Sequence, residues 1–347
     1  MTVYVLGAGA SKHAGYPLAS SMGSDLLAWM RSQVASRSNY PLIAEQIEEA
    51  FPQFEDLDDL FEQMEELINK YENGTDEQRM IRTLVANGQR PAAREAIRDW
   101  FLAIRRDEQR RAYADFAKDI VRPGDCLLTF NYDVSLDRRL KEAGKWQVGD
   151  GYGFSVEGLP ANSPTRLLKL HGSTNWLALM DGLPIRGPAR VSCVFASPRP
   201  VIGTRELDFL GYVGQRDGIF PDKSTALPAM VTGRNKKFSF DTSFGQEGGD
   251  FWRELWEQAA AALARAERVV ICGYSVPSVD EAACDLLLNT PQKDAEILAL
   301  CGTQRTDEII SEYKRRGFKS VRAADQCYFE EWVSQSVLGL AAPTTGD

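Results

Sequence analysis

The chain has 347 residues, with 40 lysines and arginines against 49 aspartates and glutamates, and a net charge of −9. This length allows one large domain or two ordinary ones. The acidic balance, without a run of lysine and arginine that could follow a phosphate backbone, argues against direct binding of nucleic acid.

The cysteines and the apolar runs indicate the compartment. Six cysteines stand at positions 126, 193, 272, 284, 301 and 327, and none forms a Cys-x-x-Cys pair. Because structural zinc sites use such close pairs, we expect no zinc and predict free thiols in a reducing compartment. No apolar run reaches the roughly 20 residues of a membrane helix, and no basic segment precedes the strand-like run at residue 3. We therefore expect a cytoplasmic protein that does not contact a membrane.

Six short apolar runs predict the strands of one sheet. Each is bounded by glycine, proline or charged residues, and helical sequence separates many of them, which is typical of strands buried on both faces. The runs are VYVL (3–6), DCLLTFN (125–131), TRLLKLHG (165–172), RVVICGYS (268–275), AEILALCG (295–302) and KSVRAA (319–324). The predicted fold class is therefore α/β, with a doubly wound, Rossmann-like parallel sheet.

Two long segments interrupt this pattern. Residues 36–122 are predicted to be a large helical insertion, because apolar residues recur at helical spacing over 54–71 and a second long helix is indicated over 91–120. Residues 181–249 are rich in glycine, proline and turns and predict an irregular segment or a lid. The sheet core is assigned to 1–35, 123–180 and 250–335, and 341–347 is expected to be a disordered tail.

The first strand leads directly into a glycine-rich loop, GAGASKHAG (7–15). Gly7 and Gly9, with Ala8 between them, allow the backbone to approach a phosphate closely. Ser11 is placed to begin a helix whose N-terminus would favour an anion. The spacing differs from the Gly-x-Gly-x-x-Gly dinucleotide fingerprint, so the loop is either a nucleotide-binding loop or a structural turn.

Polar residues also follow the second and third strands. Asn131 and Asp133 come just after the second strand, where they would hold a ribose hydroxyl or a water, or cap a helix. His171 follows the third strand. An imidazole at this place suits a general base working near neutral pH, and the alternative is a hydrogen-bonded core histidine.

A further polar turn follows the fourth strand. Gly273 and Ser275 end that strand, and Asp280 begins a helix, either as part of a second nucleotide-contacting loop or as a helix cap. The carboxyl ends of parallel strands meet at one edge of a sheet, so these turns are expected to converge on a single crevice.

Taken in order, GAGASKHAG, TFNYD (129–133), KLHGSTNW (169–176) and GYSVPSVD (273–280) resemble motifs of the sirtuin superfamily. They are most similar to its bacterial sirtuin-like branch, whose members cleave NAD+ in anti-phage defence. The resemblance covers about 1–30, 125–180 and 250–305. It implies that Gly7, Ala8, Gly9 and Ser11 would cradle the pyrophosphate. Asn131 and Asp133 would lie by the nicotinamide ribose and carboxamide, with His171 as the general base on a ribose hydroxyl. Gly273 and Ser275 would line the adenosine half, and Asp280 would also contact the nucleotide, as it matches a helix start after that loop.

Two departures from the sirtuin pattern bear on the reaction. Ordinary sirtuins carry an Ile-Pro-Asp-Phe-Arg segment after the first loop, whereas this chain has YPLA (16–19), without the aromatic that shields the reacting ribose. The paired zinc cysteines of the deacylases are absent as well. The resemblance therefore implies an NAD+ glycohydrolase in which Asn131 and His171 release nicotinamide and ADP-ribose, with NAD+ as the substrate and no further cofactor.

Other functions use the same site. One is transfer of ADP-ribose or of an acyl group, as in sirtuin deacylation, and another is a non-catalytic sensor of NAD+ or ADP-ribose. Because free NAD+ cleavage is toxic, we expect the resting protein to be restrained. The resemblance also implies a homo-oligomer, often with a companion defence protein such as a HerA-type ATPase or a short Argonaute.

Overall fold

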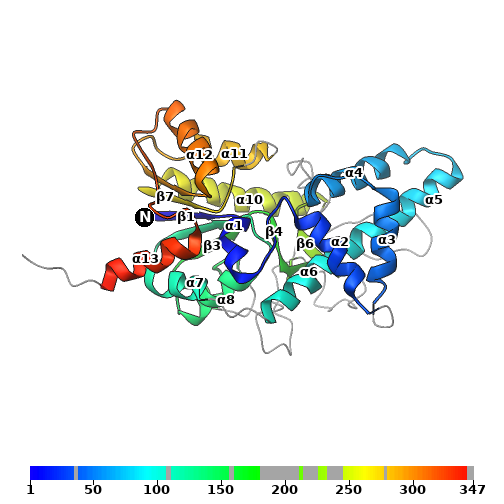
Figure 1. Ribbon diagram of the computed structural model, residues 1–347, viewed down its shortest axis with the longest axis horizontal. Coiled ribbons are helices and arrows are strands. Elements are labelled where there is room, and N and C mark those ends of the chain that lie inside the picture. Colours follow the sequence, from blue (N-terminus) through cyan, green and yellow to red (C-terminus); the bar gives the residue numbers. More distant parts are fainter. Residues whose placement is uncertain are drawn as a thin grey trace, which may run out of the picture.

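Figure 1 shows a computed structural model of the chain, in which a sheet-centred region adjoins a helical region. The structure describes residues 1–34, 38–106, 111–155, 160–179, 211–213, 226–232, 245–276 and 280–341. Within these ranges, none of the helices combines the length and the apolar character that crossing a membrane requires. The expected tail from 341 lies outside the described residues, apart from Ala341 at the end of the last helix.

Six parallel strands form the main sheet, in the order β3-β2-β1-β7-β8-β9. Each overlaps one of the six predicted runs. Their bounds are Thr2–Leu6 for β1, Cys126–Thr129 for β2, Arg166–Lys169 for β3, Arg268–Cys272 for β7, Glu296–Leu300 for β8 and Ser320–Ala323 for β9. The chain builds outward from β1 on one side and then on the other, which creates a topological switch point between β1 and β7.

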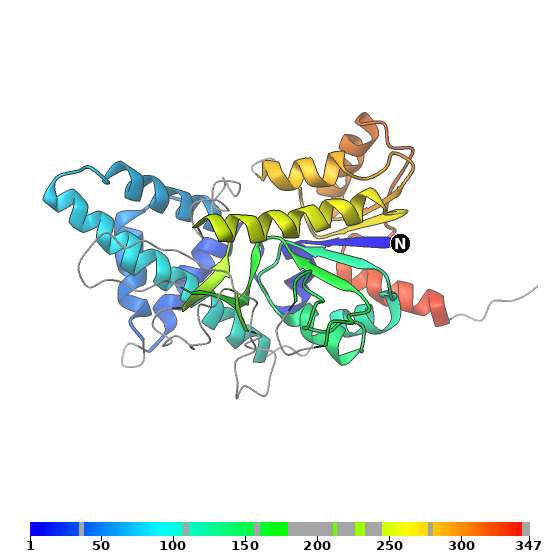
Figure 2. The ribbon, with the colours of Figure 1, turned by 180° about the vertical axis from the view of Figure 1, so that it is seen from behind.

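Helices cover both faces of this sheet (Figures 1 and 2). The central residues Val5, Leu128 and Ile271 are therefore fully buried, which explains why the strands are continuous apolar runs. One face carries α10 (Gly245–Ala264), α11 (Glu281–Asn289) and α12 (Thr303–Arg315), and the other carries α1 (Ala8–Ser11), α7 (Ala112–Asp115), α8 (Ser135–Glu142) and α13 (Phe329–Ala341). The predicted fold class, a doubly wound α/β sheet, is confirmed.

The helical region has a second hydrophobic core of its own. Its centre holds four fully buried side chains that come from four different helices: Met30, Ile47, Leu60 and Ile97. The elements are α2 (Met22–Ser32), α3 (Tyr40–Ala50), α4 (Leu57–Lys70), α5 (Asp76–Leu84), the π-helical turn η2 (Val85–Gln89) and α6 (Arg90–Arg106). The helix predicted over 54–71 is confirmed as α4, which begins three residues later because Asp56 caps it by accepting the Asp59 N–H.

The two cores divide the chain differently from the predicted insertion. The helical core already includes Tyr16 and α2, whereas Tyr113 and Phe116 belong to the sheet core. The long helix predicted over 91–120 is wrong in extent, since α6 ends at Arg106 and residues 112–120 form α7 and the π-helical turn η3 (Phe116–Ile120). The ring of Phe116 lies 5.1 Å from that of Tyr4 in β1, so this segment covers the sheet. Helical periodicity in the sequence predicts that a helix has an apolar face, but it does not show which of the two cores this face packs against.

A small second sheet follows β3. Its strands are β4 (Gly172–Leu179), β5 (Gly211–Val213) and β6 (Ala226–Met230), in the order β5-β4-β6. Residues 181–249 were expected to be irregular, yet β5 and β6 lie there and α10 begins at Gly245. Strands of three to five residues are too short to show a period, and pairing with β4 defines them. Residues 231 and 232 follow β6, and the rest of that segment lies outside the described residues.

Candidate active site

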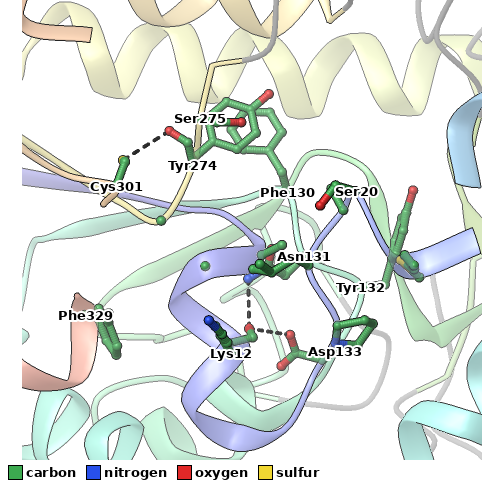
Figure 3. A pocket seen from close by; sticks show the side chains of 18 of the residues that line it. Lys12, Ser20, Phe130, Asn131, Tyr132, Asp133, Tyr274, Ser275, Cys301 and Phe329 are labelled. Carbon is green, nitrogen blue, oxygen red and sulfur yellow. Dashed lines mark hydrogen bonds between the residues drawn. The ribbon is translucent and has the colours of Figure 1, made fainter. Parts of the chain in front are cut away.

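A cavity of about 390 Å³ lies at the switch point of the main sheet, which is a size typical of small-molecule sites. It is bounded by the loops that follow β1, β2, β3, β7 and β8, and by the start of α4 from the helical region. Figure 3 shows the side chains of Lys12, Asn131 and Asp133 below those of Phe130 and Tyr274. The predicted crevice exists, and both cores contribute to its wall.

Nine of the ten predicted site residues line this cavity. They are Ala8, Gly9, Ser11, Asn131, Asp133, His171, Gly273, Ser275 and Asp280. Gly7, the tenth, lies behind the wall. A Cβ at Gly7 would come within 2.6 Å of the Tyr274 Cα, so the residue is a glycine because two backbones meet there.

The loops after β1 and β7 are held together by backbone hydrogen bonds. The Gly7 N–H donates to the Cys272 carbonyl at 3.0 Å, and the Gly9 N–H donates to the Gly273 carbonyl at 3.0 Å. Gly273 has φ of 61°, and a Cβ there would lie 2.3 Å from the Ala10 nitrogen. These two N–H groups therefore join the loops to each other, which supports the structural-turn interpretation for Gly7 and Gly9.

Ser11 is buried and contacts three other polar side chains. It ends α1, which begins at Ala8, and is the N-cap residue of the short 3-10 helix η1 (Lys12–Ala14), although its side chain makes no capping hydrogen bond there. Its Oγ donates to the Asp133 carboxylate at 2.7 Å, lies 2.7 Å from the Tyr113 hydroxyl and accepts from Asn131 Nδ2 at 2.9 Å. A hydroxyl has one proton and two lone pairs, and three partners use them all. Its contacts fasten the neighbouring polar side chains.

Asn131 is held on its nitrogen side. Nδ2 donates to the Gly7 carbonyl at 2.8 Å as well as to Ser11 Oγ. Because a backbone carbonyl only accepts, this contact fixes which amide atom is the nitrogen. Both amide hydrogens are used by the first loop, which leaves Oδ1 as the atom able to accept a hydrogen bond from a ligand.

Asp133 lies deeper in the wall, just before α8, whose N-cap residue is Val134. Besides the bond from Ser11, its Oδ1 accepts the Ser135 N–H at 3.0 Å, at the start of α8. Burial raises the pKa of Asp133 to about 6, against the lowering effects of Lys169 and of the bond from Ser11. Beneath it, Lys169 forms a buried ion pair with Asp137 at 3.2 Å and donates to the Asp133 carbonyl.

His171 occupies the turn between β3 and β4 and is 4% exposed. Its Nε2 lies 3.0 Å from Oδ2 of Asp280, and the Tyr274 hydroxyl donates to the same oxygen at 3.2 Å. The Phe130 ring stacks on the Tyr274 ring, with centroids 4.0 Å apart, and meets the His171 ring edge-on at 4.9 Å. The imidazole thus packs against the Phe130 ring and faces the Asp280 carboxylate. Burial, and then the Asp280 charge, hold the pKa of Tyr274 well above its usual value.

The second loop is open to solvent at Ser275. This residue is exposed, and its carbonyl accepts the Arg305 Nε–H at 2.9 Å. Cys301 donates its thiol to the Tyr274 carbonyl at 3.3 Å, and burial raises the pKa of that thiol to about 11. Both contacts connect this loop to the end of β8 and the start of α12.

Several lining residues were not predicted from the sequence. Lys12 stands inside the glycine-rich motif, and its charge was the available signal for a phosphate contact. Phe130 and Tyr274 flank residues that were identified, but an aromatic next to a strand end is usually core. Asp56 is the N-cap of α4 and Asp58 lies in its first turn, and no sequence signal shows that this helix reaches the cavity.

Among the residues that the structure describes, no three histidine, cysteine or acidic side chains gather where they could hold a metal ion. The five cysteines in this part of the chain are free thiols, and Cys193 lies outside it.

No protein-family model and no curated protein matches the chain. Solved structures that are similar to it include Sir2Tm bound to a propionylated peptide, at 13% identity and a TM-score of 0.40, covering 99% of this chain and 94% of that one. A Sir2 homologue in complex with ADP-ribose has 15% identity and a TM-score of 0.42, with the same coverage. Sir2 bound to an acetylated peptide has 12% identity and a TM-score of 0.38, covering 98% and 93%. Similarity at this level carries no conclusion about activity.

Proposed function

We propose that the chain binds NAD+ in this cavity and hydrolyses the bond between nicotinamide and ribose. The observation that carries the proposal is the meeting of Asn131 and His171, from the ends of β2 and β3, in one cavity at the switch point of a doubly wound sheet. Dinucleotides bind at such switch points in open α/β folds. The amide and the imidazole are polar groups of the kind that orient and deprotonate a water.

In the proposed reaction, a water oxygen bonds to the anomeric carbon of the ribose. The bond to nicotinamide breaks, and its electron pair neutralises the pyridinium ring of the leaving group. His171 accepts the proton lost by the water and passes it to solvent. Asn131 Oδ1 holds the ribose or the water in place, since its Nδ2 is already fixed by Gly7 and Ser11. The products are nicotinamide and ADP-ribose.

The remaining lining residues are assigned by position. Lys12 is exposed and directly follows α1, which contains Ala8 and Gly9, so we place the pyrophosphate there. Gly273 and Ser275, which lie toward β8, would line the adenosine half. Asp133 and Ser11 act through the side chains that they hold, because their own hydrogen-bonding groups are used inside the protein.

Nicotinamide release by the purified protein tests this proposal. Asn131→Ala and His171→Ala are each expected to lower the turnover at least a hundredfold. Asn69→Ala, an exposed position on α4, is the matched control and should leave turnover unchanged. Undiminished release in both site variants would contradict the assignment.

The same assay separates the alternatives. Tight NAD+ binding without products would indicate a sensor. ADP-ribose found on an acceptor as a mass shift, or loss of an acyl group from an acyl-lysine peptide, would indicate a transferase.

We further propose a biological setting, the regulated depletion of NAD+ during phage infection, by an oligomer that a trigger or a companion protein activates. Its support is the motif resemblance and the toxicity of unrestrained NAD+ cleavage. Cellular NAD+ measured during phage challenge, for the wild type and for His171→Ala, tests it. Equal NAD+ levels in the two strains would contradict this role.

A further inference from the structure

We propose that Asp280 is a positioning residue that holds His171 in its proton-accepting orientation, and that Tyr274 completes this unit. The inference rests on the proposed function, because it assigns a role around the same base. The observation is the sharing of one carboxylate oxygen. Oδ2 of Asp280 lies 3.0 Å from His171 Nε2 and 3.2 Å from the Tyr274 hydroxyl. The sequence had suggested that Asp280 binds the nucleotide or caps a helix.

The carboxylate is fixed on a rigid element. Its other oxygen, Oδ1, accepts the Ala283 N–H at 3.2 Å and caps α11. Ala283 and Leu287 of this helix are fully buried in the sheet core, so the helix cannot shift without disturbing that core. Oδ1 is therefore used to anchor Asp280 to α11, and Oδ2 is directed to the base.

This arrangement defines the chemistry of His171. When the ring accepts the proton of the water it becomes an imidazolium, and the Asp280 carboxylate, with Oδ2 at 3.0 Å from Nε2, stabilises its charge. Asp280 itself stays ionised throughout, as in other carboxylate–histidine pairs.

Tyr274 supports the carboxylate from the other side. Its hydroxyl donates to Asp280, and its ring is fixed by stacking on Phe130, which also contacts His171. A carboxylate that accepts several hydrogen bonds is stabilised in its charged form.

Other ionisable groups share the cavity with His171 and belong to the elements around it. They are Lys12 from η1 (Lys12–Ala14), Asp56 and Asp58 from the start of α4, Tyr132 and Asp133 after β2, Cys301 after β8, and Cys327 and Tyr328 before α13. Asp280 forms an ion-pair contact with His171, with 3.0 Å between Oδ2 and Nε2.

Asp280→Asn separates charge from structure. Asparagine caps helices as well as aspartate does, so α11 and the fold should persist, while the charge beside His171 is lost. The chain has two histidines, His13 and His171, so imidazole NMR resolves both and His171→Ala assigns them. In Asp280→Asn we expect the pKa of His171 to fall by about one unit or more, and that of His13 to stay unchanged.

Kinetics give the second measurement. Asp280→Asn should lower kcat for nicotinamide release at least tenfold, with KM changed less than threefold, and shift the acidic limb of the pH–rate profile to lower pH. Tyr274→Phe should show smaller changes in the same direction. Asp285→Asn, an exposed position on the same helix, should match the wild type in both measurements.

The outcomes separate this inference from the proposed function. The positioning role is overturned if the Asp280→Asn variant keeps both the unfolding midpoint and the His171 titration of the wild type. This holds even if the wild type hydrolyses NAD+. A shifted titration in a protein that releases no nicotinamide supports the pairing and overturns the proposed function. An Asp280→Asn variant with an unchanged kcat overturns the inference whatever the titration shows.

Discussion

The backbones of Gly9 and Gly273 are in direct contact. The Gly9 N–H donates to the Gly273 carbonyl, and a Cβ added to Gly9 would lie 2.8 Å from the Gly273 Cα. The two loops that a doubly wound sheet places on either side of its switch point are therefore a single packed unit. Any side chain at this contact must separate them.

Gly273→Ala is expected to destabilise the protein by about 2–4 kcal/mol, because a left-handed φ and a clash with the Ala10 nitrogen act together. NAD+ binding should be lost with it, since the cavity wall opens. Gly144→Ala is the matched control. It has a similar φ of 66° with no atom within 4 Å of the new Cβ, so about 1 kcal/mol is expected. Urea unfolding measures the loss of stability, and calorimetric titration with NAD+ measures the loss of binding. Equal losses of stability in the two variants would contradict the close contact between the two loops.

Ser11→Ala tests whether the Ser11 hydroxyl fixes the side chains of Asp133 and Asn131 or binds a phosphate of the ligand. Removing the hydroxyl leaves the buried Asp133 carboxylate without one donor and releases Asn131, so we expect a loss of about 1–3 kcal/mol in stability. The kcat for nicotinamide release should fall while KM changes little. If Ser11 instead cradles the pyrophosphate, KM rises and kcat is preserved. Ser24→Ala, exposed on α2, controls for the loss of a hydroxyl.

The sheet could be predicted because its strands are buried on both faces. Continuous apolar runs such as 268–275 have few other interpretations, and all six runs became strands. The positions of the site residues followed from the same fact, since each lies at the carboxyl end of one of these strands. The helical region could not be bounded in this way. Tyr113 lies in α7 and Tyr16 in the loop between η1 and α2, and only the packing assigns the first to the sheet core and the second to the helical core.

The roles of the site residues were harder to predict from the sequence than their positions in the fold. Sequence shows that Ser11 and Asp133 lie near a strand end, but not that they bond to each other across 122 positions. Asp280 likewise suggested a helix cap, and the contact with His171 depends on how α11 is set against β3. Such contacts depend on which side chains the fold brings close together, and no short stretch of the sequence shows this.

The acidity of Asp133 predicts a pH dependence of stability. Its pKa is raised from 3.8 to about 6 by burial, so the folded state binds more protons than the unfolded state between these values. Stability from this group is therefore fully present below pH 3.8 and is lost as pH rises through 6, by about 3 kcal/mol. Asp133→Asn should remove that dependence, so the variant gains stability relative to the wild type from pH 4 to 6.5. Unfolding midpoints in urea across this range measure the difference, and parallel curves for the two proteins would contradict it.

Lys12 provides a test of the phosphate position. Lys12→Met should raise the Kd for NAD+ by about threefold to tenfold, since the lost contact is charge-assisted but exposed to solvent. The effect should shrink at high salt, and nicotinamide alone should bind both proteins equally. Lys118→Met, exposed on η3, is the control for the change in net charge. An unchanged Kd for NAD+ at low salt would place the pyrophosphate elsewhere.

The ion pair between Lys169 and Asp137 beneath Asp133 predicts a strong coupling between two variants. Both side chains are at most 1% exposed, so removing one partner leaves a buried charge. Lys169→Met and Asp137→Leu should therefore each cost about 3–5 kcal/mol, whereas the double variant should recover much of that loss because no charge remains. Recovery should be incomplete, since Lys169 also donates to the Asp133 carbonyl and Asp137 accepts from the Tyr152 hydroxyl. A double-mutant cycle on unfolding free energies measures the coupling, and additive losses would mean that the two charges act separately. If stability recovers but nicotinamide release does not, the pair also serves to hold the loop that carries Asn131.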